Sequence, residues 1–486
     1  MLTVSCPGCG AEVRFRSHAA VMAVCEFCRT GVLRDADSVR DLGKVAEALE
    51  DYSPIQLGTS GTWGDRPFTV IGRLQLRYDA GFWNEWYLLF DDGAAGWLGD
   101  ASGQYTITTL LDASSTLPAF DALVPGQRYV VAGEAWIASD VRTARCTGGQ
   151  GELPFKVGAG WEARVADLRT GNRFVTLDYS DDGAPLVYAG AAVALDALKP
   201  QLLRDDDEIL RTAGKLRGKV GALDCPSCGS AIAYLPGMTA NLVCPSCSAQ
   251  LDAASPKVEV LRAGERVAAV RTTLPLGAEG TLGNQKLTVL GVMRRADDEG
   301  ESWTEYLLYG PRAGFTWLVE TGDGWQRADV LDDWPALRGD RVVAGGSSYR
   351  KLYDYPARVT FAAGAFNWRV QVGDVTQVEE FELGTTTLAA ERTAHELTWS
   401  RSTKVAYDQL RAWFPTVFGA VAAPLAKGGL RIGSRYRGAA KMMIILLVVL
   451  NAIPLIANFS STFAFVVLGG LALYLPATFL DNNDSE

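Results

Sequence analysis

Hydrophobic and polar residues alternate along several stretches of the chain. Between Phe68 and Leu76, apolar residues alternate with threonine, arginine and glutamine, which predicts a strand with one buried and one polar face. Trp86–Phe90 and Tyr306–Tyr309 are short apolar runs that suit buried strands, and Asp92-Gly93 is a hairpin-turn signal. These stretches predict β-rich bodies, each folded as a small sheet sandwich or an open barrel.

Two other stretches have helical spacing. Residues 39–50 place Leu42, Val45, Ala46 and Leu49 on one side of a helix, and residues 202–215 have a similar pattern. We interpret both as amphipathic linkers. The acidic run Asp205-Asp206-Asp207-Glu208 fits a solvated helix face better than a cation site.

The chain is a duplication. A shift of 219 residues carries the first four paired cysteines onto the last four, Thr69-Val70 onto Thr288-Val289, and Tyr87-Leu88-Leu89 onto Tyr306-Leu307-Leu308. Trp97 meets Trp317 after a slip of one residue. Self-similarity over such a length indicates two copies of one structural unit.

At 486 residues the chain is long enough for several independent cores. We expect a mainly β protein, a tandem duplication of a zinc ribbon and a small β domain, with a C-terminal two-helix transmembrane hairpin. The predicted segments are zinc ribbon 1 (1–34), a linker helix (35–56), β domain 1 (57–195), a helical linker (196–220), zinc ribbon 2 (221–254), a linker (255–275), β domain 2 (276–414), a basic juxtamembrane segment (415–440), the hairpin (441–480) and an acidic tail (481–486).

The cysteines carry the strongest chemical signal. Eight of the nine form two sets with the spacing Cys-x2-Cys, fifteen residues, Cys-x2-Cys, which can surround a tetrahedral ion. We expect two structural Zn²⁺ sites with these ligands: Cys6, Cys9, Cys25 and Cys28, and Cys225, Cys228, Cys244 and Cys247. Iron held as in rubredoxin is the main competitor, and two disulfides per module are a further alternative.

Four cysteines leave no open coordination position for water or substrate, so the predicted ions are structural rather than catalytic. Zinc ribbons often bind nucleic acid, but the formal net charge here is -10, and residues 221–254 contain no lysine or arginine. Binding to phosphate depends on such cations, so we expect no nucleic-acid partner.

The chain lacks recognisable catalytic motifs. It has no Gly-x4-Gly-Lys-[Ser/Thr] loop, no Gly-x-Ser-x-Gly elbow and no His-Glu-x-x-His, and its two histidines, His18 and His395, do not correspond under the repeat shift. Cys146 has Ala365 at the shifted position, which favours a buried thiol over a nucleophile. No catalytic or organic-cofactor residue is assigned, and a non-enzyme is favoured.

Residues 442–480 carry no charge over 39 positions, about twice the length of one bilayer span. The polar break at Asn458–Thr462 predicts two spans near residues 440–457 and 463–480. Pro454 and Asn451 weaken the first span, and a single strongly tilted helix is the alternative.

The segment before the first span has Lys427, Arg431, Arg435, Arg437 and Lys441 and no acidic residue among them. By the positive-inside rule, both termini are expected in the cytoplasm, with the chain in the inner membrane and its basic segment close to anionic lipid. This orientation agrees with the reduced thiols that metal binding requires.

The β bodies resemble the bacterial domain of unknown function numbered 4178. The likeness rests on Thr69-Val70-Ile71-Gly72, Trp86-Tyr87-Leu88-Leu89 and Glu305-Tyr306-Leu307-Leu308, and it covers both copies. Members of this family join the body to zinc-ribbon segments and membrane helices, and the family provides no catalytic residues. The resemblance implies work beside envelope-stress and polyamine-related membrane components.

We expect a scaffold or adaptor that presents duplicated β bodies to membrane-associated protein partners at the cytoplasmic face. The rival expectation is a redox protein with iron in the cysteine modules, or an enzyme with an unrecognised pocket in a β domain. The sequence identifies no small-molecule ligand.

Overall fold

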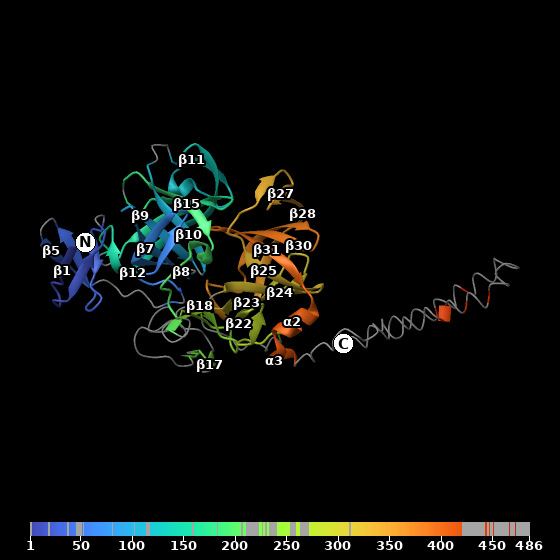
Figure 1. The fold of residues 1–486 in the computed structure, drawn as a ribbon. Coiled ribbons are helices and arrows are strands. Elements are labelled where there is room, and N and C mark those ends of the chain that lie inside the picture. The colour runs from blue at the N-terminus through green and yellow to red at the C-terminus, as the bar shows by residue number, and fades with distance from the viewer. Residues whose placement is uncertain are drawn as a thin grey trace. The chain divides into compact units, whose positions relative to one another are not determined.

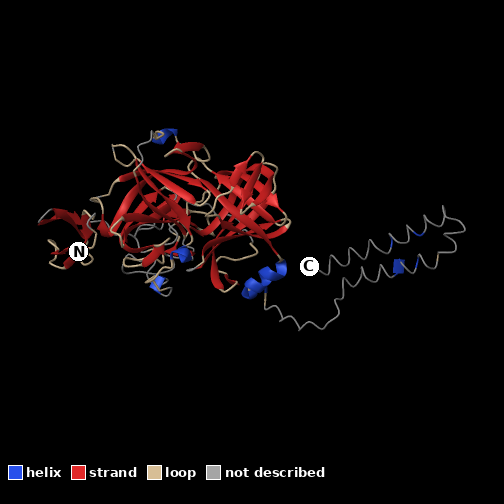
Figure 2. Ribbon diagram, turned by 45° about the horizontal axis from the view of Figure 1, so that its top comes forward, coloured by secondary structure: helices blue, strands red, loops and turns tan. Residues whose placement is uncertain are grey.

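The computed structural model divides into two compact units, Met1–Ala420 and Val421–Glu486. It describes residues 2–17, 20–35, 38–44, 51, 53–79, 81–101, 103–112, 117–157, 160–181, 183–205, 208–209, 223–225, 227–228, 231–232, 241–252, 259–262, 272–310, 313–419, 443, 444, 447, 451, 466 and 472. The described part of the first unit is built almost entirely of strands (Figure 2).

The first copy of the repeat folds into an antiparallel sheet that closes on itself. Its strand order is β7-β8-β9-β10-β15-β14-β13-β12, with β12 also paired to β7 (Figure 1). The bounds are β7 Arg66–Tyr78, β8 Gly81–Phe90, β9 Ala95–Ala101, β10 Gln104–Leu111, β12 Glu134–Leu153, β13 Glu162–Thr170, β14 Arg173–Asp178 and β15 Leu186–Val193. The short strands β6 (Ser60–Trp63) and β11 (Arg128–Val131) and the 3₁₀ turns η1 (Phe120–Ala122) and η2 (Leu195–Leu198) flank this barrel.

The barrel is closed by one long strand. Ile137–Arg145 of β12 pair with β13, and Cys146–Gly151 pair with β7 beyond a bulge. The predicted open barrel or sandwich therefore becomes a closed eight-stranded barrel, because β12 is long enough to hydrogen-bond to two walls in succession. Closure removes free sheet edges from the ring.

The second copy repeats this arrangement in the order β22-β23-β24-β25-β31-β30-β29-β28, with β28 paired back to β22. The bounds are β22 Gln285–Ala296, β23 Ser302–Gly310, β24 Gly314–Thr321, β25 Gly324–Val330, β28 Ser347–Phe366, β29 Val375–Leu383, β30 Thr386–Arg392 and β31 Leu397–Val405. The strands β21 (Glu279–Leu282), β26 (Ala336–Arg338) and β27 (Arg341–Ala344) lie beside it, and helices α2 (Tyr407–Trp413) and α3 (Pro415–Phe418) follow. Leu410 and Phe414 are fully buried in the core of this copy.

Each cysteine module is attached to its barrel by backbone hydrogen bonds. In the first module β3 (Met22–Val24) pairs with residues 151–153 of β12, and in the second β18 (Asn241–Val243) pairs with residues 364–366 of β28. The other module strands are β1 Leu2–Ser5, β2 Glu12–Phe15, β4 Thr30–Asp35, β5 Ser38–Lys44, β16 Leu223–Asp224, β17 Ala231–Ile232, β19 Gln250–Asp252 and β20 Glu259–Arg262. The strands β3–β5 and β18–β20 thus extend the barrel sheets, whereas β1–β2 and β16–β17 form separate two-stranded sheets.

The predicted linker helix at residues 39–50 is wrong over its first part. Ser38–Lys44 form β5, which pairs with β4 from Asp35 to Thr30. The pairing with β4, which has a register shift between Thr30 and Val32, gives these residues inter-strand hydrogen bonds and overrides their helical spacing. Residues 45–50 lie outside the described part. In the second predicted helix only Glu208 and Ile209 are described as helical.

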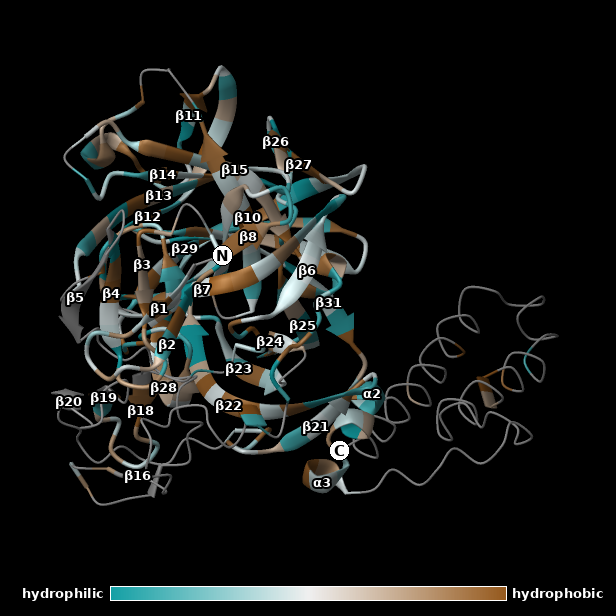
Figure 3. Ribbon diagram, turned by 60° about the vertical axis from the view of Figure 1, so that its left-hand side comes forward, coloured by the Kyte–Doolittle hydropathy of each residue, from teal (hydrophilic) through white to brown (hydrophobic). Residues whose placement is uncertain are grey.

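The strand β7 was predicted to have one polar face, but both of its faces are buried from Val70 to Leu76. A bulge between Val70 and Gly72, against β8, reverses the alternation. Arg73 and Gln75 therefore lie on the same face as Val70, and they are buried at 3% and 2% exposure. Hydrophobic and hydrophilic stretches follow one another along the barrel strands (Figure 3). The predicted turn at Asp92-Gly93 is confirmed, with Gly93 at φ +86.

Gly151 and Gly364 occupy the same place in the two copies, where module, long strand and barrel meet. Each has a positive φ, and a Cβ atom would lie 2.3 Å from the backbone oxygen of Ile71 or of Leu290. We expect Gly151→Ala to lower the free energy of unfolding by about 3 kcal/mol. Urea unfolding of the full chain measures this loss.

Gly183→Ala is the matched control, because Gly183 is exposed and a Cβ atom there meets nothing within 4 Å. We expect this change to stay within about 0.5 kcal/mol. Equal effects of the two alanines would show that the junction tolerates a side chain.

The predicted membrane spans near residues 440–457 and 463–480 lie outside the described residues, apart from single positions. In the part of the chain that the structure describes, no helix has the length and apolar character needed to cross a bilayer.

Candidate metal centres and buried polar clusters

The structure brings together the eight cysteines predicted as ligands. Cys6 Sγ lies 3.6 Å from Cys28 Sγ, and Cys9 Sγ lies 3.7 Å from Cys25 Sγ. In the second module the corresponding distances are 3.8 Å from Cys225 to Cys247 and 3.7 Å from Cys228 to Cys244. Within each set the four sulfur atoms lie within 4.8 Å of one another.

These distances fit a single ion in each set. Four sulfur atoms placed 2.3 Å from one ion at the corners of a tetrahedron lie about 3.8 Å apart. All nine cysteines are free in this structure, which therefore contains neither of the two disulfides per module that were the alternative to a metal ion. Both sets can hold a metal ion, and Zn²⁺ and iron are equally compatible with four sulfur ligands.

The first set is seated in a small core. Cys6 and Cys25 are buried beside Phe15, Val13 and Val32, whereas Cys9 is exposed at the surface. The hairpin β1–β2 carries the first knuckle, and the turn between β3 and β4 carries the second. An ion held here would tie together two hairpins whose buried apolar residues form one small cluster.

The remaining candidates have no catalytic setting. Burial raises the pKa of the Cys146 thiol to about 11, and its sulfur lies 3.7 Å from the carbonyl oxygen of Gly148. The strand pairings make Val359, and not Ala365, its counterpart in the second copy. His395 is exposed in a turn, where its carbonyl accepts a hydrogen bond from the Val141 amide. His18 lies outside the described residues.

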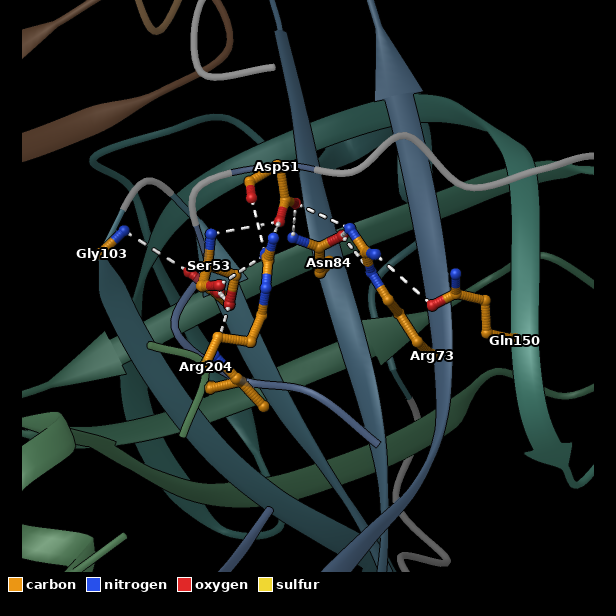
Figure 4. A network of polar contacts seen from close by, with 9 residues as sticks. Asp51, Ser53, Arg73, Asn84, Gly103, Gln150 and Arg204 are labelled. Carbon is orange, nitrogen blue, oxygen red and sulfur yellow. Dashed lines mark hydrogen bonds and ion pairs between the residues drawn. The ribbon is translucent and has the colours of Figure 1, made fainter. Parts of the chain in front are cut away.

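A buried polar network that the sequence did not indicate lies beside the first barrel (Figure 4). Arg73 donates to Asp51 at 2.8 Å, and Asn84 donates to the same carboxylate oxygen at 2.6 Å. Arg204 donates to the backbone oxygens of Asp51 and Ser53 at 2.7 and 3.0 Å. The Asp51 and Arg73 side chains are 5% and 3% exposed, so this ion pair is shielded from water.

Asp100 ends the network. It accepts a hydrogen bond from the Ser53 hydroxyl, and burial together with the negative charge of Asp51 raises its pKa to about 6. In the second copy Glu320 takes its place and accepts hydrogen bonds from the Thr273 and Tyr306 hydroxyls, both at 2.6 Å.

Two cavities lie next to these carboxylates. One of about 250 Å³ is lined by residues of both copies, among them Asp100 and Tyr105 of the first and Tyr309 and Phe315 of the second. The other, of about 260 Å³, is lined by residues that include Thr304 and Glu320. Neither lining contains a histidine or a cysteine. The cavities therefore provide polar walls without a nucleophile paired to an imidazole base.

Comparison with protein families gives a match in both copies, to a domain of unknown function (DUF4178), at residues 56–194 and 275–406. The two matches cover more than half of the chain and coincide with the two barrels. This chain belongs to the DUF4178 family. No curated protein and no solved structure matches it significantly.

Each DUF4178 barrel carries acidic side chains inside its ring. In the first copy, Glu85 on β8 faces Asp167 on β13 and Asp178 on β14, which belong to the opposite wall. Burial, followed by the negative charges of Asp167 and Asp178, raises the pKa of Glu85 to about 8. The Trp83 indole donates to Glu85 at 2.8 Å, and the Thr176 hydroxyl donates to Asp167 at 2.7 Å.

The raised pKa of Glu85 predicts a pH-dependent stability. The folded protein holds this proton up to pH about 8, whereas the ordinary value is 4.5, so the folded state binds more protons between these limits. The contribution of Glu85 to stability is therefore largest below pH 4.5 and decreases as the pH rises toward 8. Glu85→Gln cannot ionise, and its stability relative to the parent protein should increase across this window.

Urea unfolding at pH 5 and pH 8.5 tests this expectation, with Glu162→Gln as the control. Glu162 is exposed on β13, so its replacement removes a carboxylate at the surface and leaves the barrel interior unchanged. A difference between Glu85→Gln and the parent protein that is the same at both pH values would contradict the prediction.

Proposed function

We propose that this DUF4178 protein is a zinc-containing scaffold that presents its two barrels to membrane-associated proteins. It is held at the cytoplasmic face of the inner membrane by residues 441–480. The observation that carries the proposal is the continuity of each cysteine module with its barrel through β12 or β28.

Four cysteines complete the coordination of each ion, so a bound zinc would be structural. Its effect would be to hold together the two hairpins of a module, of which one contains the strand, β3 or β18, that pairs with the barrel. Two modules and two barrels would then form a stiff surface, which suits a protein that positions others.

Metal analysis separates this proposal from a redox role. We expect about two zinc ions per chain and no visible absorbance. If the preparation contained iron and showed iron–thiolate absorbance bands that bleach on reduction, the redox hypothesis would be favoured over the scaffold hypothesis.

The membrane assignment rests on the uncharged residues 442–480 and the basic segment before them. After an alkaline carbonate wash we expect the full chain to stay with the membrane and a chain ending at residue 440 to be released. Release of both would refute the anchor.

Partners are tested by crosslinking in cells, followed by purification from gently solubilised membranes and mass spectrometry. A scaffold should recover the same proteins in repeated experiments. It should lose them when Cys6→Ser and Cys225→Ser are combined, while the membrane anchor is unchanged. Recovery of no specific protein would count against the proposal.

A further inference from the structure

The strand pairings place the acidic residues of the two barrels at matching positions. Leu74 pairs with Glu85 in the first copy, and Met293 pairs with Glu305 in the second, at the same distance beyond equivalent bulges. The residue pairings between successive strands of the two barrels also match. By these pairings Glu380 is the counterpart of Asp167, and Glu391 is the counterpart of Asp178. Three inward carboxylates therefore recur in both copies.

In the second barrel a cation of the protein itself lies between two of these carboxylates. Arg295 on β22 donates to Glu305 at 3.2 Å and reaches across the ring to Glu391 at 2.9 Å. Its side chain is 5% exposed, so the guanidinium is enclosed. The third carboxylate, Glu380, accepts a hydrogen bond from the Tyr355 hydroxyl at 2.8 Å.

In the described part of the first barrel no cation takes this place. Leu76 occupies the position of Arg295, and among the described residues no lysine or arginine forms an ion pair with Glu85, Asp167 or Asp178. Asp178 accepts hydrogen bonds from the Ser180 amide and hydroxyl.

Other basic groups are close but engaged elsewhere. Arg142 forms ion pairs with Asp140 and Glu396, and the Arg169 guanidinium lies over the rings of Phe174 and Trp334. Burial raises the pKa of Asp167 to about 7, and the positive charges of Arg169 and Arg142 oppose this shift only in part. The carboxylates that match the Arg295 clamp, Glu85 and Asp178, thus remain without a cation.

Glu85, Asp167 and Asp178 are partly exposed, whereas Glu305 in the second barrel is only 8% exposed. Eight-stranded barrels have interiors that are either filled by side chains or wide enough for one small ligand. A largely buried carboxyl group without a counter-ion is costly to ionise, and Glu85 therefore keeps its proton to a higher pH than usual. A cationic ligand would remove that cost and favour the ionised carboxylates.

We propose that the first barrel binds a small organic cation with a guanidinium or primary ammonium head, held between Glu85 and Asp178. The bound head would take the place that the Arg295 guanidinium has in the second barrel. Trp83, whose indole contacts Glu85, would lie beside it.

Calorimetric titration of the full chain tests the proposal, with methylguanidinium chloride and n-butylammonium chloride as probes. Methylurea and 1-butanol are matched neutral controls. We expect one cation per chain for at least one probe and no binding of either neutral compound. Equal binding of the neutral compounds, absence of binding by both cations, or tighter binding of Mg²⁺ or Ca²⁺ at this site would overturn the assignment.

Two variants locate the site. Glu85→Gln should weaken binding by about tenfold or more, because a charge-assisted hydrogen bond is lost. Leu76→Arg should abolish binding by supplying the guanidinium that the second copy already has. Glu162→Gln, on the outside of β13, should bind as the parent protein does.

Circular dichroism in the near ultraviolet shows whether each variant keeps its packing. If Leu76→Arg does not fold, Glu85→Gln alone decides the result. Unchanged affinity in a folded Glu85→Gln variant would refute the site.

Discussion

We expect replacement of Cys6 by serine to lower the metal content from two ions per chain to one and to unfold the first cysteine module. The module has a core of few apolar residues around Phe15, and structural zinc binding supplies on the order of 10 kcal/mol in modules of this size. With three sulfur ligands that energy is largely lost. We expect one ion per chain by elemental analysis and new protease cleavage sites between residues 2 and 35.

The other cysteines provide the controls. Cys225→Ser should give the same loss of one ion, with cleavage in the second module. Cys146→Ser should keep both ions, because its sulfur lies in the barrel core among Leu76, Ala144 and Leu153. Two ions in purified Cys6→Ser would contradict the four-sulfur site.

Replacement of Arg73 by methionine will destabilise the first copy by about 3 kcal/mol, because the buried Asp51 carboxylate loses its nearer cation. Arg73 lies 2.8 Å from this carboxylate, whereas the Arg204 guanidinium, which remains, lies 4.0 Å away. Asn84 and the Ser53 amide would still donate to this carboxylate, but neither neutralises it. Urea unfolding, followed by tryptophan fluorescence, measures the loss.

A second arginine on the same strand is the matched control. Arg66 pairs with Asp92 where the two side chains are 38% and 53% exposed, so Arg66→Met should cost at most about 1 kcal/mol. Adding Asp51→Asn to Arg73→Met should restore part of the stability, because it removes a buried charge that has lost its nearer cation. Equal losses for the two arginines would show that the Asp51–Arg73 pair contributes no more than a surface pair.

The sequence was sufficient to predict the duplication and the two groups of four cysteines that the structure brings together. Cysteine pairs with fixed spacing carry their geometry within a short segment, so Cys6 and Cys28 could be assigned to one site before any fold was known. The β character of the bodies followed from the alternation around Phe68 and from the turn at Asp92-Gly93. Closure of the barrel did not follow, because it depends on the long β12 pairing with β7 and β13 in turn.

The acidic residues inside the barrels were missed for a definite reason. A constant shift of 219 places Glu85 on Thr304, Asp167 on Thr386 and Asp178 on Leu397. The hairpin between β7 and β8 is one residue shorter than its counterpart, so the true counterpart of Glu85 lies one residue after the shifted position. The counterparts of Asp167 and Asp178 lie before their shifted positions. Only the strand register, which sets which residues share a face, restores the three matches.

The bulge after Val70 had a similar effect. It places Arg73 with the apolar face of β7, whereas strict alternation placed this arginine on the polar face. A buried network can therefore arise from residues whose sequence pattern is that of an ordinary surface strand.

The pairing of β3 with the end of β12 has a consequence for any attempt to isolate a barrel. If the chain were cut before β6, residues 151–153 of β12 would lose their neighbour and present unpaired amide and carbonyl groups to solvent. Such an edge is a template for further strands and promotes self-association into fibrils. The cysteine modules would therefore protect the sheet edge from pairing with other chains. If oxidation removed bound ions and unfolded the modules, we expect this edge to become free and the protein to aggregate.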